Sequence, residues 1–376
     1  MSIRTADPMF MTGATGFLGQ FVLRDLLARG LRLVVMVRPP LAGSAERLGR
    51  LMAEIGTDLE ACLGRGQLIL VEGALPEALP EPTWGRTWAI LHCAASIKLF
   101  LNGDGDPFHT NVEGTGALLA WAERHGINRL FAVSTAYTCG WSRGLVLETF
   151  HREAPEFQTD YERSKWLAEN MLAAWSENSG RQLTVFRPSF LVGDSQTGYT
   201  TQFGGFYQLA RLIALLKQQH ARNGNGNGGP THIPLRIPGR AEDAQDFVPV
   251  DFVSRLMTEV ILRPEFHGRI YHLTSPERFT NGFIKECFEE YFGLCGGTFT
   301  DPAKVLGRCS PDEALLWDQY SIMTPRVVHC PRFDMTHTRE VMQAGGIRFP
   351  TLDRQRVFRL FDYATAKGWG RSNGHR

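Results

Sequence analysis

The stretch TGATGFLG at residues 12–19 decides which fold we expect of this chain. Its glycines Gly13, Gly16 and Gly19 recur at every third position, directly after a short apolar run and directly before an amphipathic pattern. A turn this tight needs residues without a β-carbon, so that the backbone can approach a ligand closely. The amides at the start of the following helix then point at that ligand and favour an anion. A strand, a glycine turn and a helix in this order predict a site for a dinucleotide pyrophosphate.

Outward from this turn, short apolar runs alternate with helical patterns through the first half of the chain. Between the first two runs, Leu18, Phe21, Val22 and Leu26 share one face of a helix, and Gly30 is placed to end it. This alternation predicts an α/β protein with a Rossmann-type doubly wound parallel sheet. The runs that we predict to be strands are 9–11, 31–37, 67–73, 88–95, 129–135 and 183–189.

The 376 residues allow one large domain or a domain that carries a smaller lobe. We expect the dinucleotide-binding domain over residues 1–195, rejoined by about 232–275. Residues 196–231 and 276–376 are then expected to form a smaller, mainly helical substrate-binding lobe. They are rich in aromatic and aliphatic residues, which favours a lipophilic substrate.

Three local patterns lie beyond the sixth predicted strand. The stretch NGNGNGGP at 223–230 is predicted to be a loop, because Asn and Gly favour turns and supply no core. The stretch AEDAQDFVPVDFV at 241–253 resumes a strand-like pattern. Residues 281–293 show the periodicity of an amphipathic helix.

Charge and cysteine content exclude several functional classes. The 40 Lys and Arg residues nearly balance 39 Asp and Glu residues, so no overall field draws the chain to nucleic acid or anionic lipid. Seven scattered cysteines without a C-x-x-C pair predict neither a disulfide framework nor a zinc site. We see no signal peptide, and the most apolar helical stretch, 206–216, is too short to span a bilayer. These features favour a cytoplasmic enzyme without a metal.

A second motif is the pair Tyr161 and Lys165, within QTDYERSKWLAENML at 158–172. Helical spacing places the two side chains on one face. The pair is either a solvated helix face or a proton donor with a cation beside it. In the second case the ammonium favours the phenolate and lowers the phenol pKa from its usual value near 10.

Glycine turn, hydroxyl-rich strand end and Tyr-x-x-x-Lys follow one another in the order used by extended short-chain dehydrogenase/reductases, and the sequence resembles that superfamily over about residues 9–260. Within it, the thioester reductase and fatty acyl-CoA reductase branch is the most similar. The motifs that carry this resemblance are HCAAS at 92–96, VSTAYTCG at 133–140, YERSKWLAE at 161–169, RPSFLVGDSQTG at 187–198 and DFVPVDFV at 246–253.

The resemblance implies a catalytic set of Thr135, Tyr161, Lys165 and Asn111. Thr135 would polarise a substrate carbonyl, and Tyr161 would give its proton to the developing alkoxide. Lys165 would tune Tyr161 and hold the nicotinamide ribose. Asn111 would organise a water-mediated proton path, although a helix cap is an equally good interpretation of this residue.

The glycine turn and the resemblance together predict a set of cofactor contacts, from the turn itself, from strand ends and from the catalytic helix. At the second strand end, Arg38 stands where an acid would bind a ribose, which favours NADP(H), with NAD(H) still possible. Arg38 could instead stack on adenine or face water, and Arg47 is a second candidate for the 2'-phosphate. The predicted contacts are Gly13, Thr15, Gly16, Phe17, Leu18, Gly19, Arg38, Ala94, Ala95, Ser134, Tyr161, Lys165, Pro188 and Ser189.

Two neighbours of these residues have alternative roles. Ser134 could be a buried hydroxyl bonded to backbone rather than a cofactor contact. His92, at the end of the fourth predicted strand, is expected to pack and hydrogen-bond rather than to catalyse.

The sequence departs from the superfamily at two places. Gly73 is followed by Ala74 where the third strand commonly ends Gly-Asp near the adenine, and no proline closely precedes Tyr161, unlike in nucleotide-sugar epimerases. The first hypothesis is NAD(P)H-dependent hydride transfer to a ketone, aldehyde or thioester of a lipophilic intermediate, which is a hydrophobic small molecule or a carrier-bound or CoA thioester. The alternatives are an epimerase or dehydratase and a non-catalytic dinucleotide-binding protein.

Overall fold

The chain forms two compact units, each built from separate stretches of sequence. Unit 1 comprises Met1–Ser189, Val250–Thr274 and Arg332–Phe349, and unit 2 comprises Phe190–Pro249, Ser275–Pro331 and Pro350–Arg376. The computed structural model describes residues 7–178, 180–222, 229–301, 304, 309–320 and 330–370.

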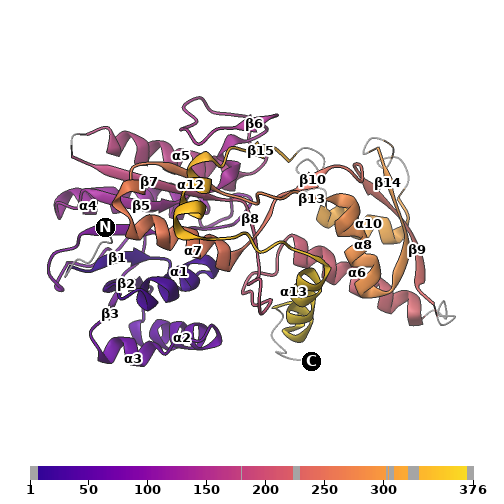
Figure 1. The fold of residues 1–376 in the computed structure, drawn as a ribbon, viewed down its shortest axis with the longest axis horizontal. Helices are drawn as coiled ribbons and strands as arrows, with labels where there is room; N and C mark the ends of the chain where they lie inside the picture. Colours follow the sequence, from indigo (N-terminus) through magenta and orange to yellow (C-terminus); the bar gives the residue numbers. More distant parts are fainter. Residues whose placement is uncertain are drawn as a thin grey trace. The chain divides into compact units, whose positions relative to one another are not determined.

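Unit 1 is built on a seven-stranded sheet in the order β12-β7-β5-β4-β1-β2-β3, with every neighbouring pair parallel (Figure 1). The strand order reverses between β1 and β4, so a ligand crevice is expected outside the carboxyl ends of these two strands. The strands are β1 Met9–Thr12, β2 Leu33–Val37, β3 Leu68–Glu72, β4 Ala89–His92, β5 Arg129–Val133, β7 Gln182–Pro188 and β12 Ile270–Leu273.

Helices cover this sheet in two groups. In one, α1 packs on α7 and α7 on α12, and in the other α4 packs on α5. The chain runs from β1 to β2 on one side of β1 and later continues from β4 on the other side. Because crossovers between parallel strands are right-handed, the two groups of helices lie on opposite faces of the sheet. The helices of unit 1 are α1 Phe17–Ala28, α2 Leu41–Glu54, α3 Leu59–Gly64, η1 His109–Glu113, α4 Gly114–Arg124, η2 Ala136–Cys139, α5 Asp160–Ser176, α7 Val250–Leu262, η3 Pro264–Phe266 and α12 Thr336–Gly345.

A hydrophobic core lies between the sheet and the α4–α5 face. Phe10, Val34 and Ile90 come from three neighbouring strands and are fully buried. Trp121 of α4 lies over Phe10 with ring centroids 4.6 Å apart, and Trp175 of α5 joins the same cluster. Burying side chains of this size contributes about 2 kcal/mol or more each, which fixes α4 and α5 on the sheet.

The expected strands and the first helix agree with the structure, with one correction. Each of the six predicted strands is present in the sheet, and α1 ends at Ala28, before Gly30 with its φ of +82°. The strand-like pattern at 241–253 is wrong after Pro249, because α7 begins at Val250. Most residues of α7 are buried, so its first residues resemble a buried strand in sequence. Most of the predicted loop at 223–230 lies outside the described residues.

Unit 2 is mainly helical, with short strand pairs at its edges. Phe206, Phe288 and Phe361 come from three helices and form its centre, with ring centroids 5.1–5.7 Å apart. Its elements are β8 Phe190–Val192, α6 Phe206–Arg222, β9 Thr231–Pro238, β10 Ala244–Gln245, β11 Phe247–Pro249, β13 Phe279–Thr280, α8 Asn281–Phe292, β14 Leu294–Thr300, α10 Pro311–Tyr320, α13 Arg354–Ala366 and η4 Gly368–Gly370.

The units divide the chain differently from the expected domains 1–195 with 232–275, and 196–231 with 276–376. Residues 190–195 and 232–249 belong to unit 2, because β8 pairs with β11 and β9 pairs with β14. Residues 332–349 belong to unit 1 instead of the carboxyl-terminal lobe, because β15 Arg332–Phe333 pairs with β6 Leu145–Val146. Such pairings join residues far apart in sequence, so no local pattern indicates them.

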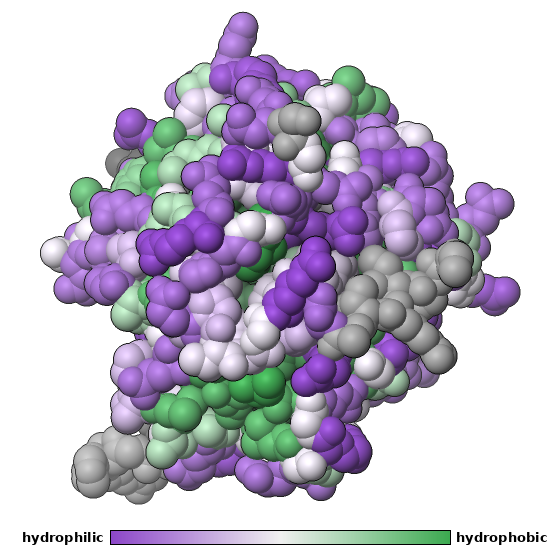
Figure 2. Space-filling model, turned by 90° about the vertical axis from the view of Figure 1, so that its left-hand side faces the viewer, coloured by the Kyte–Doolittle hydropathy of each residue, from purple (hydrophilic) through white to green (hydrophobic). Residues whose placement is uncertain are grey.

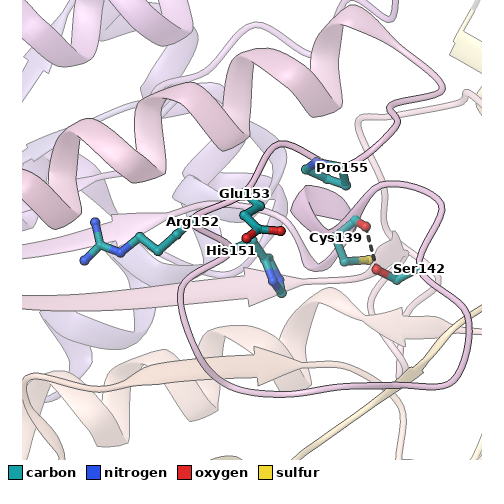
Figure 3. A pocket seen from close by; sticks show the side chains of 6 residues that line it. All are labelled: Cys139, Ser142, His151, Arg152, Glu153 and Pro155. Carbon is teal, nitrogen blue, oxygen red and sulfur yellow. Dashed lines mark hydrogen bonds between the residues drawn. The ribbon is translucent and has the colours of Figure 1, made fainter.

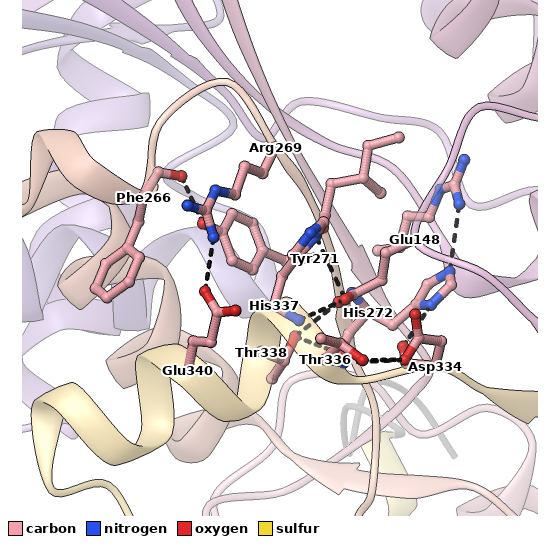
Figure 4. Close-up of polar contacts among 12 residues, drawn as sticks. Glu148, Phe266, Arg269, Tyr271, His272, Asp334, Thr336, His337, Thr338 and Glu340 are labelled. Carbon is pink, nitrogen blue, oxygen red and sulfur yellow. Dashed lines mark hydrogen bonds and ion pairs between the residues drawn. The ribbon is translucent and has the colours of Figure 1, made fainter.

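A buried carboxylate holds this returning segment in unit 1 (Figure 4). Glu148 accepts hydrogen bonds from the backbone amides of His272 (2.9 Å) and His337 (2.7 Å) and from the Thr338 hydroxyl (3.2 Å). His337 and Thr338 lie in the first turn of α12, so Glu148 satisfies a helix amino terminus with a negative charge. This contact links the β6 region, β12 and α12.

Figure 2 shows a face covered mostly by hydrophilic side chains, with one concentrated hydrophobic patch. Among the described helices, none has the length and apolar character needed to cross a bilayer.

Candidate active site

The glycine turn between β1 and α1 leaves no room for side chains. A β-carbon on Gly13, whose φ is +77°, would lie 2.4 Å from the Ala94 nitrogen, and one on Gly19 would lie 2.1 Å from the Gly13 oxygen. Gly16 is exposed, donates its amide to the Gly13 oxygen at 3.0 Å, and precedes α1 without a capping side chain. An open helix amino terminus beside bare backbone fits a pyrophosphate.

The other turn residues differ in what they can offer. Thr15 is half-buried, so its side chain can still reach a ligand. Phe17 and Leu18 are buried, and Phe17 packs edge-on against Phe21 at 6.0 Å. Any contact from Phe17 and Leu18 to a phosphate would therefore come from their backbone amides, which lie in the first turn of α1.

An acid from the neighbouring strand β3 lies beside the end of β2, and the sequence of β2 does not indicate it. Arg38 and Arg47 are both exposed. Glu72 of β3 is the register partner of Val37, and its carboxylate accepts the Leu41 amide at the start of α2 at 2.7 Å. In the sequence, Glu72 is recognisable only as an acid at the end of an apolar run. Its position beside β2 follows from the order of the strands in the sheet.

At the end of β4, small residues leave the strand accessible. Ala94 is half-buried and Ala95 is exposed. The Ala94 amide donates to the Thr12 hydroxyl at 3.3 Å, which ties the ends of β4 and β1 together. Beyond β3, Ala74 exchanges two backbone hydrogen bonds with Ala78, of 2.7 and 2.8 Å, so its amide is already engaged.

Tyr161 and Thr135 meet through their side chains. Tyr161 lies in the first turn of α5, which begins after the capping residue Thr159, and Thr135 is buried at the end of β5. Burial raises the pKa of the Tyr161 phenol to about 12, although the hydrogen bond with the Thr135 hydroxyl opposes this shift and Glu162 adds to it. The phenol is consequently protonated at neutral pH.

Lys165 is buried one turn further along α5, but it does not tune the phenol as expected. Its ammonium donates to the Val133 oxygen at 2.7 Å. Burial lowers the pKa of Lys165 to about 8, against the charges of Glu169 and Cys93. The expected lowering of the Tyr161 pKa is wrong for this chain, because desolvation outweighs every attraction to the phenolate.

Asn111 is not a helix cap, because its amide lies within η1 and is fully used. Its Oδ1 accepts the Ser96 amide at 2.8 Å, and its Nδ2 donates to the Ser96 oxygen and to the Ser164 hydroxyl, both at 2.9 Å. Ser164 in turn donates its hydroxyl to the backbone carbonyl oxygen of Tyr161 at 2.8 Å. Asn111 therefore joins the loop after β4 to the helix that carries Tyr161.

Ser134, Pro188 and Ser189 close the carboxyl ends of β5 and β7. The Ser134 hydroxyl is buried and has no partner among the described residues, so its expected bond to backbone is wrong. Pro188 is buried at the end of β7, and the Ser189 amide donates to the Leu273 oxygen at 3.3 Å. Unsatisfied buried hydroxyls are uncommon, which makes Ser134 a natural contact for a ligand.

Arg187, just before Pro188, has a structural role that the motif did not reveal. It is fully buried and forms an ion pair with Glu169 of α5, with Nε 3.1 Å from Oε2. Its guanidinium also donates to the Thr149 oxygen at 2.9 Å. The pair fixes α5 against β7 and thereby holds Tyr161 and Lys165 in place.

An apolar loop beside Tyr161 was missed in the sequence. Ile97, Leu99, Phe100 and Leu101 are 40–59% exposed. The loop is nevertheless anchored, because the Tyr161 amide donates to the Leu99 oxygen at 3.2 Å and Asp160 accepts the Leu101 amide at 2.9 Å. Apolar runs are normally buried, so sequence alone gave no signal that this one is displayed.

A separate cavity of about 400 Å³ opens beside η2 in unit 1 (Figure 3). None of the predicted site residues lines it. Its lining residues are Cys139, Ser142, His151, Arg152, Glu153 and Pro155. Among the described residues we find no cluster of three or more His, Cys, Asp or Glu side chains arranged to hold a metal.

Known proteins resemble this chain over nearly its whole length. An aldehyde reductase, lnaA, of Aspergillus flavus is 27% identical over 96% of this chain and 36% of its own length. The chain thus spans about a third of that curated relative. The terminal R domain of the myxalamid PKS-NRPS pathway superposes with a TM-score of 0.79 at 22% identity, covering 98% of this chain and 92% of that domain.

A second solved structure shows the same fold. It is a thiolation-reductase di-domain from an archaeal non-ribosomal peptide synthetase, with a TM-score of 0.73 at 18% identity over 98% of this chain and 77% of that one. The family described as "Male sterility protein", an NAD-binding family, matches residues 11–257. The chain therefore belongs to that NAD-binding family, and its fold is that of the two reductase-domain structures above.

Proposed function

We propose that the chain reduces the thioester carbonyl of a lipophilic, carrier-bound or CoA-linked acyl group with NADPH and releases an aldehyde. One hydride and one proton add to the carbonyl, the C–S bond breaks, and the aldehyde and a free thiol leave. The bound dinucleotide supplies the hydride. Reduction of a free ketone or aldehyde is the same step without the C–S cleavage.

The observation that carries this proposal is the hydrogen bond between the Thr135 hydroxyl and the phenol of Tyr161, which lies on the helix that also carries the buried Lys165. A pKa of about 12 keeps the proton on Tyr161 at neutral pH, so the residue acts as an acid towards a developing alkoxide. Thr135 is hydrogen-bonded to that phenol, and we assign its hydroxyl to polarising the substrate carbonyl. Lys165, with a pKa of about 8, is still charged at pH 7 and is the cation for the ribose.

The substrate class is inferred from the surroundings of Tyr161. The anchored loop at 97–101 displays apolar side chains next to the proton donor, and this supports a lipophilic acyl group. The names of the related proteins concern aldehyde reduction and thiolation-linked reductase domains, which supports a thioester. We assign further substrate selection to unit 2, whose centre is aromatic.

NADPH is proposed over NADH because of Arg38. Its exposed guanidinium can pair with a 2'-phosphate. The nearby acid Glu72 already accepts the Leu41 amide through one carboxylate oxygen, so an unphosphorylated ribose would compete with that bond.

The variant Tyr161→Phe tests the reaction. Removing the proton donor should lower kcat by about 100-fold or more with long-chain acyl thioesters and saturating NADPH. The dissociation constant for NADPH should stay within about twofold, since the phenol hydroxyl is not needed to bind the pyrophosphate. Turnover is followed by cofactor absorbance, and aldehyde and free thiol are quantified.

The matched control is Tyr271→Phe on β12, which removes a buried hydroxyl that donates to the Phe266 oxygen of η3. It should lose stability but keep turnover. Retained activity in Tyr161→Phe would contradict the proposal. Conversion of a sugar nucleotide without net NADPH consumption would instead favour an epimerase, and tight NADPH binding without any turnover a non-catalytic role.

A further inference from the structure

A buried chain of hydrogen bonds runs beneath the cofactor crevice of unit 1 and centres on His92. At one ring nitrogen, Nδ1 lies 2.8 Å from the Thr12 hydroxyl, which accepts the Ala94 amide at 3.3 Å. At the other, Nε2 lies 3.4 Å from the Thr115 hydroxyl, which donates to the Asn111 oxygen at 2.6 Å. Thr12, His92 and Thr115 are all at most 3% exposed.

The partners determine the tautomer of His92. Thr115 gives its only hydroxyl proton to the Asn111 oxygen, so it must accept from Nε2–H of His92. Nδ1 then carries no proton and accepts from the Thr12 hydroxyl. Every donor in the chain thus points the same way, from the Ala94 amide through Thr12, His92 and Thr115 to the Asn111 oxygen.

This tautomer requires a neutral ring. Burial lowers the pKa of His92 to about 3, and the charge of Lys165 acts in the same direction. A neutral imidazole with one donor and one acceptor is the only form that satisfies both threonines at once.

We propose that His92 is a positioning residue for dinucleotide binding, which holds the ends of β1 and β4 and the start of α4 at a fixed spacing. The glycine turn packs closely on the end of β4, since a β-carbon on Gly13 would lie 2.4 Å from the Ala94 nitrogen, so the shape of the turn depends on these strand ends staying together. The same chain reaches Asn111, whose side chain fixes the loop after β4 and the Tyr161 helix. The proposal rests on dinucleotide binding alone and does not depend on the substrate.

The test is a fluorescence titration with NADPH of His92→Phe, which keeps a ring of similar shape and removes both nitrogens. Leaving two buried threonines unsatisfied should weaken NADPH binding by about tenfold or more. Thr115→Val, which breaks only the far link, should weaken it less. His92→Asn places an acceptor near the Nδ1 position and should recover part of the affinity.

The control is His267→Phe, because His267 is similarly buried at 7% and bonds the Ile261 oxygen away from the crevice. It should lower the melting temperature and leave the NADPH dissociation constant within about twofold. If His92→Phe loses only stability, as His267→Phe does, His92 is an ordinary core residue and the proposal is overturned. An inflection near pH 6.5 in wild-type NADPH binding that disappears in His92→Phe would overturn the neutral tautomer.

If His92→Phe does not fold, Thr115→Val and Thr12→Val decide the matter, since both keep the side-chain shape. Unchanged NADPH affinity in both would contradict the proposal. Because the readout is binding of NADPH itself, a failure of the thioester reaction leaves this result interpretable.

Discussion

Lys165 shows how a single functional residue can act against stability. Its ammonium is buried and balanced chiefly by the Val133 oxygen, with Glu169 nearby. Burial of the charge accounts for a pKa of about 8 in place of the usual 10.5, which corresponds to about 3 kcal/mol of destabilisation at pH 7. A charge kept in such a place is expected when a ligand needs it.

We therefore expect Lys165→Met to raise the free energy of unfolding at pH 7 by on the order of 1–3 kcal/mol while abolishing turnover. Between pH 8 and 10.5 the folded wild type loses this proton and the unfolded chain keeps it, so wild-type stability rises with pH there. The difference in the free energy of unfolding between Lys165→Met and the wild type should therefore decrease over that range. Urea titrations at pH 7, 9 and 10.5 measure it. A difference that stays constant with pH would show that burial does not lower the pKa of Lys165.

Gly19, in the first turn of α1, is constrained by the close approach of the Gly13 carbonyl. We expect Gly19→Ala to displace the Gly13 carbonyl and to weaken NADPH binding by about tenfold or more, because the turn can no longer hold its shape. Gly43→Ala is the control: it also lies in a helix, has no neighbour closer than 3.9 Å, and should gain about 0.5–1 kcal/mol. Equal NADPH affinities in the two variants, measured by titration, would rule out this account of the turn.

At the scale of elements, the site depends on contacts that fix α5 and the loop before η1. The Arg187–Glu169 pair joins α5 to β7, and Asn111 joins η1 to the loop through Ser96. Leu99 accepts the Tyr161 backbone amide, which ties the loop to the start of the helix that carries the proton donor. The backbone hydrogen bonds of this loop hold its apolar side chains in an exposed position. Such a loop is expected to contact an apolar ligand.

Phe100→Ser tests that function of the loop. Removing about half a phenylalanine's apolar contact should raise KM for a long-chain acyl thioester by about five- to tenfold and leave a short-chain thioester unaffected. Leu145→Ser in β6, where the exposed fraction is 56%, should change neither value. A uniform rise in KM for both chain lengths would point to a distorted site and not to a lost acyl contact.

At the scale of the whole molecule, the chain passes between its two units five times, and unit 1 is completed only by residues 332–349. Glu148 is the anchor of that last segment, because it bonds both β12 and the first turn of α12. Burial raises the pKa of the Glu148 carboxyl, while the amides of His272 and His337 favour its ionised form.

Glu148→Ala should therefore loosen α12 without unfolding unit 1. We expect hydrogen exchange at the His337 and Thr338 amides to accelerate by about tenfold or more, since a buried acceptor of amides is lost. Amides in β1 and β4 should keep their protection and serve as the internal control. Unchanged protection at the start of α12 would show that β15 alone holds the segment.

The sequence by itself determined the β1–glycine turn–α1 unit, the alternation of strands and helices, and the pairing of Tyr161 with Lys165 on one helical face. These are local: a missing β-carbon, a hydrophobic period and a four-residue spacing act within a few residues. Tertiary structure alone decided that Glu72 stands beside β2, that α12 returns to unit 1, that the loop at 97–101 is exposed, and that burial keeps the Tyr161 phenol protonated. Those outcomes depend on which distant segments come into contact and on how much water these contacts exclude. No short stretch of residues determines either one.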